Sequence, residues 1–86
     1  MEETHNIEYK RQWRDEWLQW ICGFANAEGG IINIGLDDHG NPVGLDKIKK
    51  LMEDIPSKII NKLGIVPDVK QLTKDGIDYI EITVKA

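Results

Sequence analysis

The feature that most constrains the fold is residues 24–44, where an apolar helix end meets a double glycine, a buried strand and an acidic turn. Gly29 and Gly30 predict a tight reversal through positive φ, since glycine has no Cβ to clash there. The segment 31–36 is nearly all apolar, which is typical of a strand covered on both faces. Asp37-Asp38 follows where the strand ends and can face solvent, a cation or a ligand. The pattern predicts a helix packed closely beside a strand.

A tryptophan-rich helix is expected before this reversal. Asp15 can cap a helix that begins at Glu16 and runs to about Glu28, because its carboxylate can accept from the free N–H groups of the first turn. Aromatic residues recur at helical spacing, which predicts a core-facing stripe; they are Trp13, Trp17, Trp20 and Phe24. Trp13 lies just outside the helix, between two arginines, and is the tryptophan that could instead stack on a ligand.

The remaining elements follow from apolar spacing. Residues 7–10 alternate apolar and charged, as a short half-buried strand does. From Leu45 to Leu63 the apolar residues share one helical face, and Pro56 predicts a kink or two abutting helices. Gly64 ends that helix. Strands over 66–71 and 77–85 are predicted to form a hairpin, with Asp75-Gly76 marking the reversal and Ile80, Ile82 and Val84 facing the core.

This order predicts an α/β (α+β) fold: a mixed sheet of about four to five strands, with an N-terminal helix and a kinked helix pair packed on it. The 86 residues suit a single domain, 1–86. Cys22 is the one cysteine, which excludes an internal disulfide and a cysteine-based zinc cage. No apolar run approaches the roughly 20 residues that a membrane span needs, and the N-terminus is not signal-like, so the predicted location is cytoplasmic and no membrane partner is expected.

The net charge of −4 does not by itself favour nucleic acid, because phosphates need cations. The distribution is more informative than the sum. Lys10, Arg11 and Arg14 cluster near the start of the first helix and could contact phosphates there. The alternative is that Arg11 and Arg14 simply pair with the acidic residues that follow them, Asp15 and Glu16.

Several segments together resemble the Schlafen/AlbA-like family, domains found at the N-terminus of many bacterial transcriptional regulators and assigned to DNA binding. The matching segments are 8–10 (EYK), 20–30 (WICGFANAEGG), 34–40 (IGLDDHG), 43–45 (VGL) and 79–84 (YIEITV). The resemblance covers nearly the whole chain. In this family a proline-containing link and another strand normally follow, so the resemblance implies that the last strand of the domain lies beyond Ala86.

The resemblance implies a nucleic-acid-binding module, with DNA as the partner, that has no catalysis and no cofactor of its own. Its expected contact residues are Lys10, Arg11, Arg14 and Trp13. The residues expected to build the structural turns are Asn26, Gly29, Gly30 and Gly35.

A second branch of the family implies an alternative. Some animal Schlafen proteins are endoribonucleases with an acidic site of two glutamates and an aspartate. The matching positions are Glu3, Glu8 and Asp38, which could hold Mg²⁺ or Mn²⁺ if they converged. Residues five apart in a flat strand point to opposite faces, so Glu3 and Glu8 meet only if the chain bends between them.

Two further hypotheses concern nucleotides and assembly. The family has also been described as ATPase-like, and Gly30 and Gly35 have half of a phosphate-loop spacing. Leu36-Asp37 stands where that loop needs Lys and Ser or Thr, which argues against ATP binding. An exposed sheet edge with nearby aromatic surface favours a homodimer as the third function class, beside a binding module and an enzyme.

Overall fold

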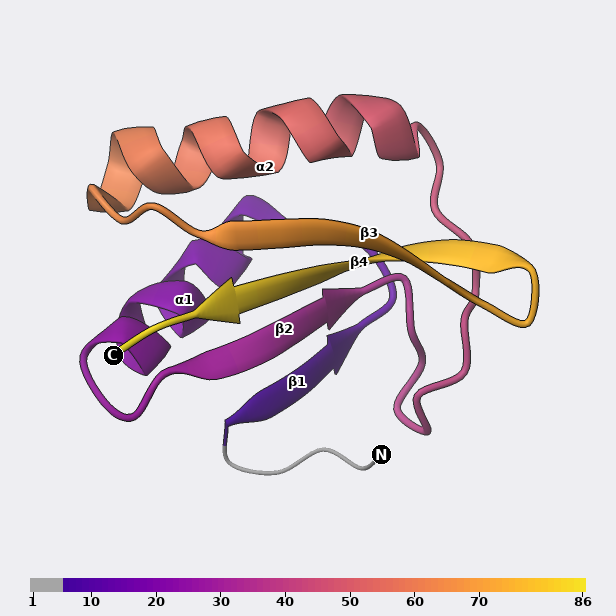
Figure 1. Ribbon diagram of the computed structural model, residues 1–86, viewed down its shortest axis with the longest axis horizontal. Helices are drawn as coiled ribbons and strands as arrows, with labels where there is room; N and C mark the ends of the chain where they lie inside the picture. Colours follow the sequence, from indigo (N-terminus) through magenta and orange to yellow (C-terminus); the bar gives the residue numbers. More distant parts are fainter. Residues whose placement is uncertain (1–5) are drawn as a thin grey trace.

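A computed structural model describes residues 6–86 (Figure 1). In chain order its elements are β1 (Ile7–Lys10), the 3-10 helix η1 (Asp15–Trp17), α1 (Leu18–Ala25), β2 (Gly30–Ile34), α2 (Ile48–Leu63), β3 (Asp68–Lys74) and β4 (Ile77–Val84). The strands form one mixed sheet in the order β1-β2-β4-β3. The predicted α/β class is confirmed, with four strands in the part of the chain that the structure describes.

Strand pairing places β2 and β4 in the middle of the sheet, with β1 and β3 at its edges. β1 and β2 are parallel, with η1 and α1 in the connection between them. β2 and β4 are antiparallel, and Ile32 pairs with Ile82 while Ile34 pairs with Ile80. Because paired residues in a sheet point to the same face, these four isoleucines form one apolar surface.

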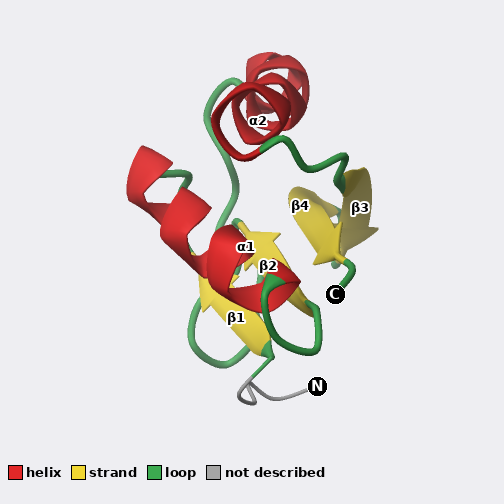
Figure 2. Ribbon diagram, turned by 90° about the vertical axis from the view of Figure 1, so that its left-hand side faces the viewer, coloured by secondary structure: helices red, strands yellow, loops and turns green. Residues whose placement is uncertain are grey.

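Both helices cover that apolar surface. In Figures 1 and 2, α1 lies against β2 and β4, and α2 lies beside β3 and β4. Ile21 and Phe24 of α1 join Ile55 and Ile59 of α2 in one buried cluster with the strand residues Ile32, Ile34, Ile80, Ile82 and Val84. Burying one such side chain contributes roughly 1.5–3 kcal/mol, so this single layer holds the domain together.

The helix α2 is continuous where the sequence suggests a kinked pair. It is one helix of 16 residues with Pro56 inside it. Its predicted apolar face is confirmed, since Ile55 and Ile59 are fully buried and Ile48 and Met52 pack against the core. The predicted end is also confirmed: Gly64 follows the helix with φ of +66° and donates its N–H to the carbonyl of Ile60.

Gly29 and Gly30 are required for different physical reasons, one for its backbone conformation and the other for space. Gly29 has the expected positive φ, +82°, and donates its N–H to the carbonyl of Phe24 at 2.8 Å. Gly30 does not have a positive φ, so that part of the prediction is wrong. Gly30 is needed for space instead, since a Cβ there would lie 2.7 Å from the Asn6 carbonyl oxygen and from the Phe24 ring.

The hairpin and the first helix differ from expectation only in their bounds. Asp75 and Gly76 form the two-residue turn between β3 and β4, with φ of +54° and +76°, as the type I′ turn requires. The first helix is shorter than predicted, because Asp15–Trp17 is a 3-10 turn and α1 ends at Ala25. Asn26 follows as the cap and donates its N–H to the Cys22 carbonyl.

One buried polar side chain lies at the centre of the sheet. Asn33 is 1% exposed and pairs with Tyr9 on one side and Glu81 on the other, so all three point away from the helix-covered face. Within residues 6–86 its Nδ2 has no hydrogen-bond partner. The prediction that this strand is covered on both faces is therefore confirmed at its centre, where the second face buries Asn33 beside Tyr9. None of the helices in residues 6–86 is both long and apolar enough to cross a bilayer.

Candidate nucleic-acid interface

The basic residues lie at the sheet edge where the parallel strands β1 and β2 both end. The Lys10 carbonyl accepts N–H donors from Gly35, at 2.7 Å, and from Leu36, at 3.2 Å, which fixes the two strand ends together. Gly35 has a φ of +101°, and a Cβ on it would lie 2.9 Å from the side chain of Leu45. A hollow of about 370 Å³ opens at this edge; we call it the basic hollow, and it is lined by Tyr9, Lys10, Arg11, Gln12, Arg14, Trp17 and Asp38.

The Lys10 ammonium is held by its own chain. It lies 4.4 Å from the centroid of the Trp17 ring and 5.0 Å from that of Trp20, within cation–π range of both. Its Nζ is also 3.7 Å from a carboxylate oxygen of Glu8. With three partners and a side chain only 20% exposed, Lys10 contributes a fixed positive charge to the basic hollow rather than a mobile contact.

Trp17 fixes the loop that carries the two arginines. Its indole Nε1 donates to the Gln12 carbonyl at 2.9 Å, and its backbone N–H donates to the Arg14 carbonyl at 3.0 Å. The side chains of Arg11, Gln12 and Arg14 are all exposed. The loop is therefore ordered at its backbone while its guanidinium groups face solvent.

The pairing expected for the two arginines is half right. Arg14 lies 3.3 Å from a carboxylate oxygen of Glu16, and both side chains are more than half exposed. An exposed pair of this kind contributes about 0–1 kcal/mol, so a phosphate can compete for the guanidinium. Among the described residues no ion pair involves Arg11, and its positive charge makes a small contribution to the lowered pKa of Asp37. Both guanidinium groups can therefore serve as anion contacts.

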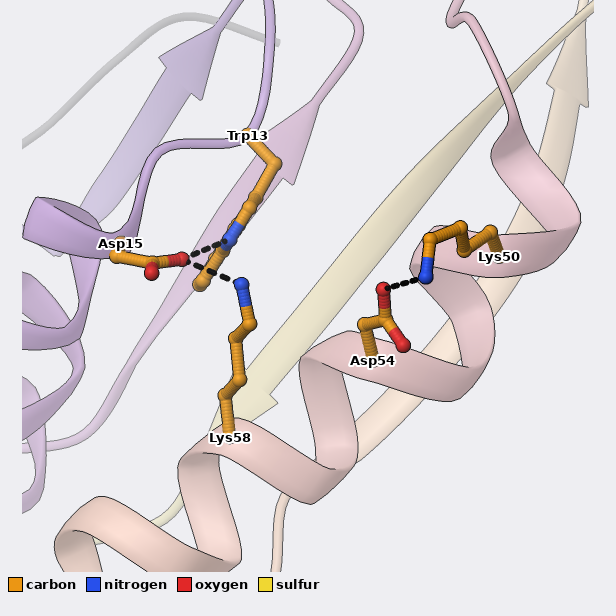
Figure 3. A network of polar contacts seen from close by, with 5 residues as sticks. All are labelled: Trp13, Asp15, Lys50, Asp54 and Lys58. Carbon is orange, nitrogen blue, oxygen red and sulfur yellow. Dashed lines mark hydrogen bonds and ion pairs between the residues drawn. The ribbon is translucent and has the colours of Figure 1, made fainter.

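Asp15 joins the start of the first helix to α2 (Figure 3). One carboxylate oxygen accepts from Trp13 Nε1 at 2.9 Å and from Lys58 Nζ at 2.7 Å. These contacts, the Lys58 bond above all, hold the pKa of Asp15 below its usual value. The predicted capping role is wrong, because Asp15 lies within η1 and, among residues 6–86, no side chain caps η1 or α1. The ring of Trp13, predicted as a stacking surface, packs against the core cluster.

The two aspartates of the acidic turn have separate roles. One oxygen of Asp37 accepts the N–H groups of His39 and Asn41, each at 2.9 Å, and these bonds lower the pKa of Asp37. Asp37 is thus committed to shaping the turn. Asp38 is exposed and lines the basic hollow beside the arginines.

The structure describes two of the three residues of the alternative acidic site. Glu3 lies outside the described residues, Glu8 contacts Lys10, and Asp38 lines the same hollow as Lys10. Within residues 6–86 no three His, Cys, Asp or Glu side chains form a metal-holding group. A divalent cation between Glu8 and Asp38 would have to share this space with the Lys10 ammonium. Convergence of Glu3, Glu8 and Asp38 stays a prediction.

The sequence pattern misses a second depression, on the outer surface of α1. It measures about 450 Å³ and is lined by Gln19, Trp20, Gly23, Phe24 and Ala27; we call it the α1 groove. Trp20, predicted to be core, is 40% exposed here, whereas Phe24 one turn later is 6% exposed. The absence of a side chain at Gly23 is the signal that could have revealed it. The aromatic stripe therefore divides between core and surface.

Comparisons with known proteins agree with this architecture. A family model described as Schlafen, AlbA_2 matches residues 3–86. The crystal structure of the DIP2311 protein from Corynebacterium diphtheriae superposes with a TM-score of 0.74 at 20% sequence identity, covering 100% of this chain and 19% of that one. At that identity the likeness shows the fold, and the chain spans about a fifth of the other protein's length. The comparison with proteins of curated description returned no match.

Proposed function

The chain belongs to the Schlafen, AlbA_2 family, and from that membership we propose that it is a nucleic-acid-binding module, with DNA as the ligand and a bacterial transcriptional regulator as its context. Binding is through phosphates at the basic hollow. Arg11 and Arg14 make the contacts, Lys10 adds a fixed charge, and the module carries out no chemistry of its own.

The observation that carries the proposal is the ordered loop with outward arginines. Trp17 holds the backbone of residues 12 and 14 by two hydrogen bonds, so little loop entropy is lost when a phosphate binds. A guanidinium presents several N–H donors in a planar fork, which suits phosphate oxygens. Because the chain as a whole carries −4, the attraction is local to this edge of the sheet.

This arrangement predicts weak and salt-dependent binding. Two or three neutralised phosphates give a slope of log K against log salt of about −2 to −3 on duplex DNA. Asp38 also lines the basic hollow, and its carboxylate repels a phosphate. Phosphate binding is therefore expected on the side of the hollow formed by the arginines.

The test is fluorescence anisotropy of a labelled 20-base-pair duplex, titrated with the protein at several salt concentrations. Arg11→Glu combined with Arg14→Glu should weaken binding at low salt by roughly tenfold or more, and should remove about 2 from the salt slope. The matched control is Lys49→Glu with Lys62→Glu, which makes the same change in net charge on exposed positions of α2. Equal effects of the two double variants would show that only net charge matters and would refute the site.

A further inference from the structure

The α1 groove has an aromatic wall, of which Trp20 is 40% exposed to solvent and Phe24 only 6%. Trp20 and Phe24 form this wall, with ring centroids 6.3 Å apart and planes tilted by 53°. Gly23 also lines the groove, and within residues 6–86 a Cβ built on it meets no atom within 4 Å apart from its chain neighbours and its own helix backbone. The lining is mainly apolar and open on one side, so a planar group could lie against Trp20 without moving the helix.

The groove adjoins the basic hollow through a shared lysine. The Lys10 ammonium lies over the ring of Trp17, which lines the hollow, and over the ring of Trp20, which lines the groove. The two depressions therefore lie on neighbouring surfaces of the first helix, one cationic and one aromatic. Their chemistry is complementary to a ligand that carries a negative charge close to a flat apolar ring.

Resting on the proposed function, we propose that the ligand is a single-stranded or locally unpaired nucleic-acid segment, with one base stacked on Trp20 in the α1 groove. Its neighbouring phosphate binds Arg11 and Arg14. Base stacking on an aromatic side chain combined with a cationic track for the backbone is the usual basis of sequence-tolerant single-strand binding. A paired base cannot use this groove, because both of its faces are already stacked in a duplex.

The experiment compares two labelled probes, a 12-nucleotide single strand and the fully paired 12-base-pair duplex that the same strand forms with its complement. Trp20→Ala removes the stacking wall, and Gly23→Leu fills the groove from a helical position that has room for a Cβ. Ile60→Ala, an exposed apolar position on α2, is the control, and circular dichroism melts establish that each variant is folded. Either groove variant should weaken single-strand binding about fivefold to 100-fold and change duplex binding less than twofold.

The arginine variant separates the two proposals. If Arg11→Glu with Arg14→Glu abolishes binding while both groove variants bind the single strand as the wild type does, the groove proposal is overturned and the proposed function stands. If the arginine variant binds both probes normally, the proposed function fails and the groove proposal fails with it. Equal losses on both probes in Gly23→Leu would also overturn the groove proposal.

Discussion

Four glycines differ in two separate properties, the sign of φ and the space available for a Cβ, and so form a complete set for substitution by alanine. Gly23 has room and an ordinary φ, and Gly64 has room with a φ of +66°. Gly30 has an ordinary φ but no room, and Gly29 has a φ of +82° and a Cβ position 2.6 Å from the Val84 carbonyl oxygen. The series separates strain in the backbone from crowding at the helix–sheet junction.

The expected changes in the free energy of unfolding follow from these two terms. Gly23→Ala should stabilise by up to about 1 kcal/mol, because alanine is the better helix former. Gly64→Ala should cost about 1–2 kcal/mol for left-handed backbone. Gly30→Ala should cost about 1–3 kcal/mol from overpacking, and Gly29→Ala should cost the sum, about 2–5 kcal/mol. A domain of this size has about 4–13 kcal/mol in total, so Gly29→Ala removes a large share.

Urea denaturation followed by tryptophan fluorescence measures all four changes on one scale. The order of stability should be Gly23→Ala, wild type, Gly64→Ala or Gly30→Ala, and then Gly29→Ala. This expectation would be refuted if the free energy of unfolding of Gly29→Ala lay within 1 kcal/mol of the wild-type value, or if Gly23→Ala destabilised the protein as much as Gly30→Ala. Backbone φ and the space for a Cβ would then not explain why glycine occupies this turn.

Three further predictions concern single contacts. Trp17→Phe keeps an aromatic ring but loses the hydrogen bond from the indole N–H to the Gln12 carbonyl. This loss should lower the free energy of unfolding in urea by about 1 kcal/mol and speed hydrogen exchange in residues 11–14. Unchanged exchange would contradict the role of Trp17 in ordering the loop. Asn33→Leu removes a buried donor that has no partner among the described residues and should stabilise the protein by about 1–3 kcal/mol in urea denaturation; a loss of stability would contradict this expectation. Because the pKa of Asp15 is lowered in the folded state, its stabilising contribution is complete above about pH 4 and is lost as the pH falls through the lowered pKa; the melting temperature of Asp15→Asn should therefore fall less between pH 5 and pH 2 than that of the wild type, and parallel curves would refute the assignment.

The elements that sequence patterns locate correctly are those whose cause is local. Alternation in residues 80–84 and the three- and four-residue spacing from Ile48 to Ile59 both indicate burial on one face, and the structure confirms both. The start of the first helix is different, because Asp15 is held by Lys58, which is 43 positions away along the chain. A rule based on neighbouring residues assigns Asp15 to a helix cap, because such a rule does not consider a partner so distant in sequence.

The site shows the same division. The basic cluster and the acidic turn can be located from sequence, since their residue types are explicit. The position of the Lys10 ammonium cannot be predicted, because the two indole rings beside it come from two different helices, η1 and α1. The α1 groove cannot be predicted for a related reason. The lack of a side chain at Gly23 indicates a groove only once the positions of the side chains around it are known.

The position of β4 between β2 and β3 has a consequence for how the protein is made. Gly30 to Ile34 pair with Ile80 to Val84, so one side of β2 has no partner until the last residues of β4 leave the ribosome. At about 5–20 residues per second, the newborn chain presents that strand for a few seconds. During this interval Ile32 and Ile34 are open to pairing with neighbouring nascent chains, and a chaperone that shields them would raise the yield of folded protein.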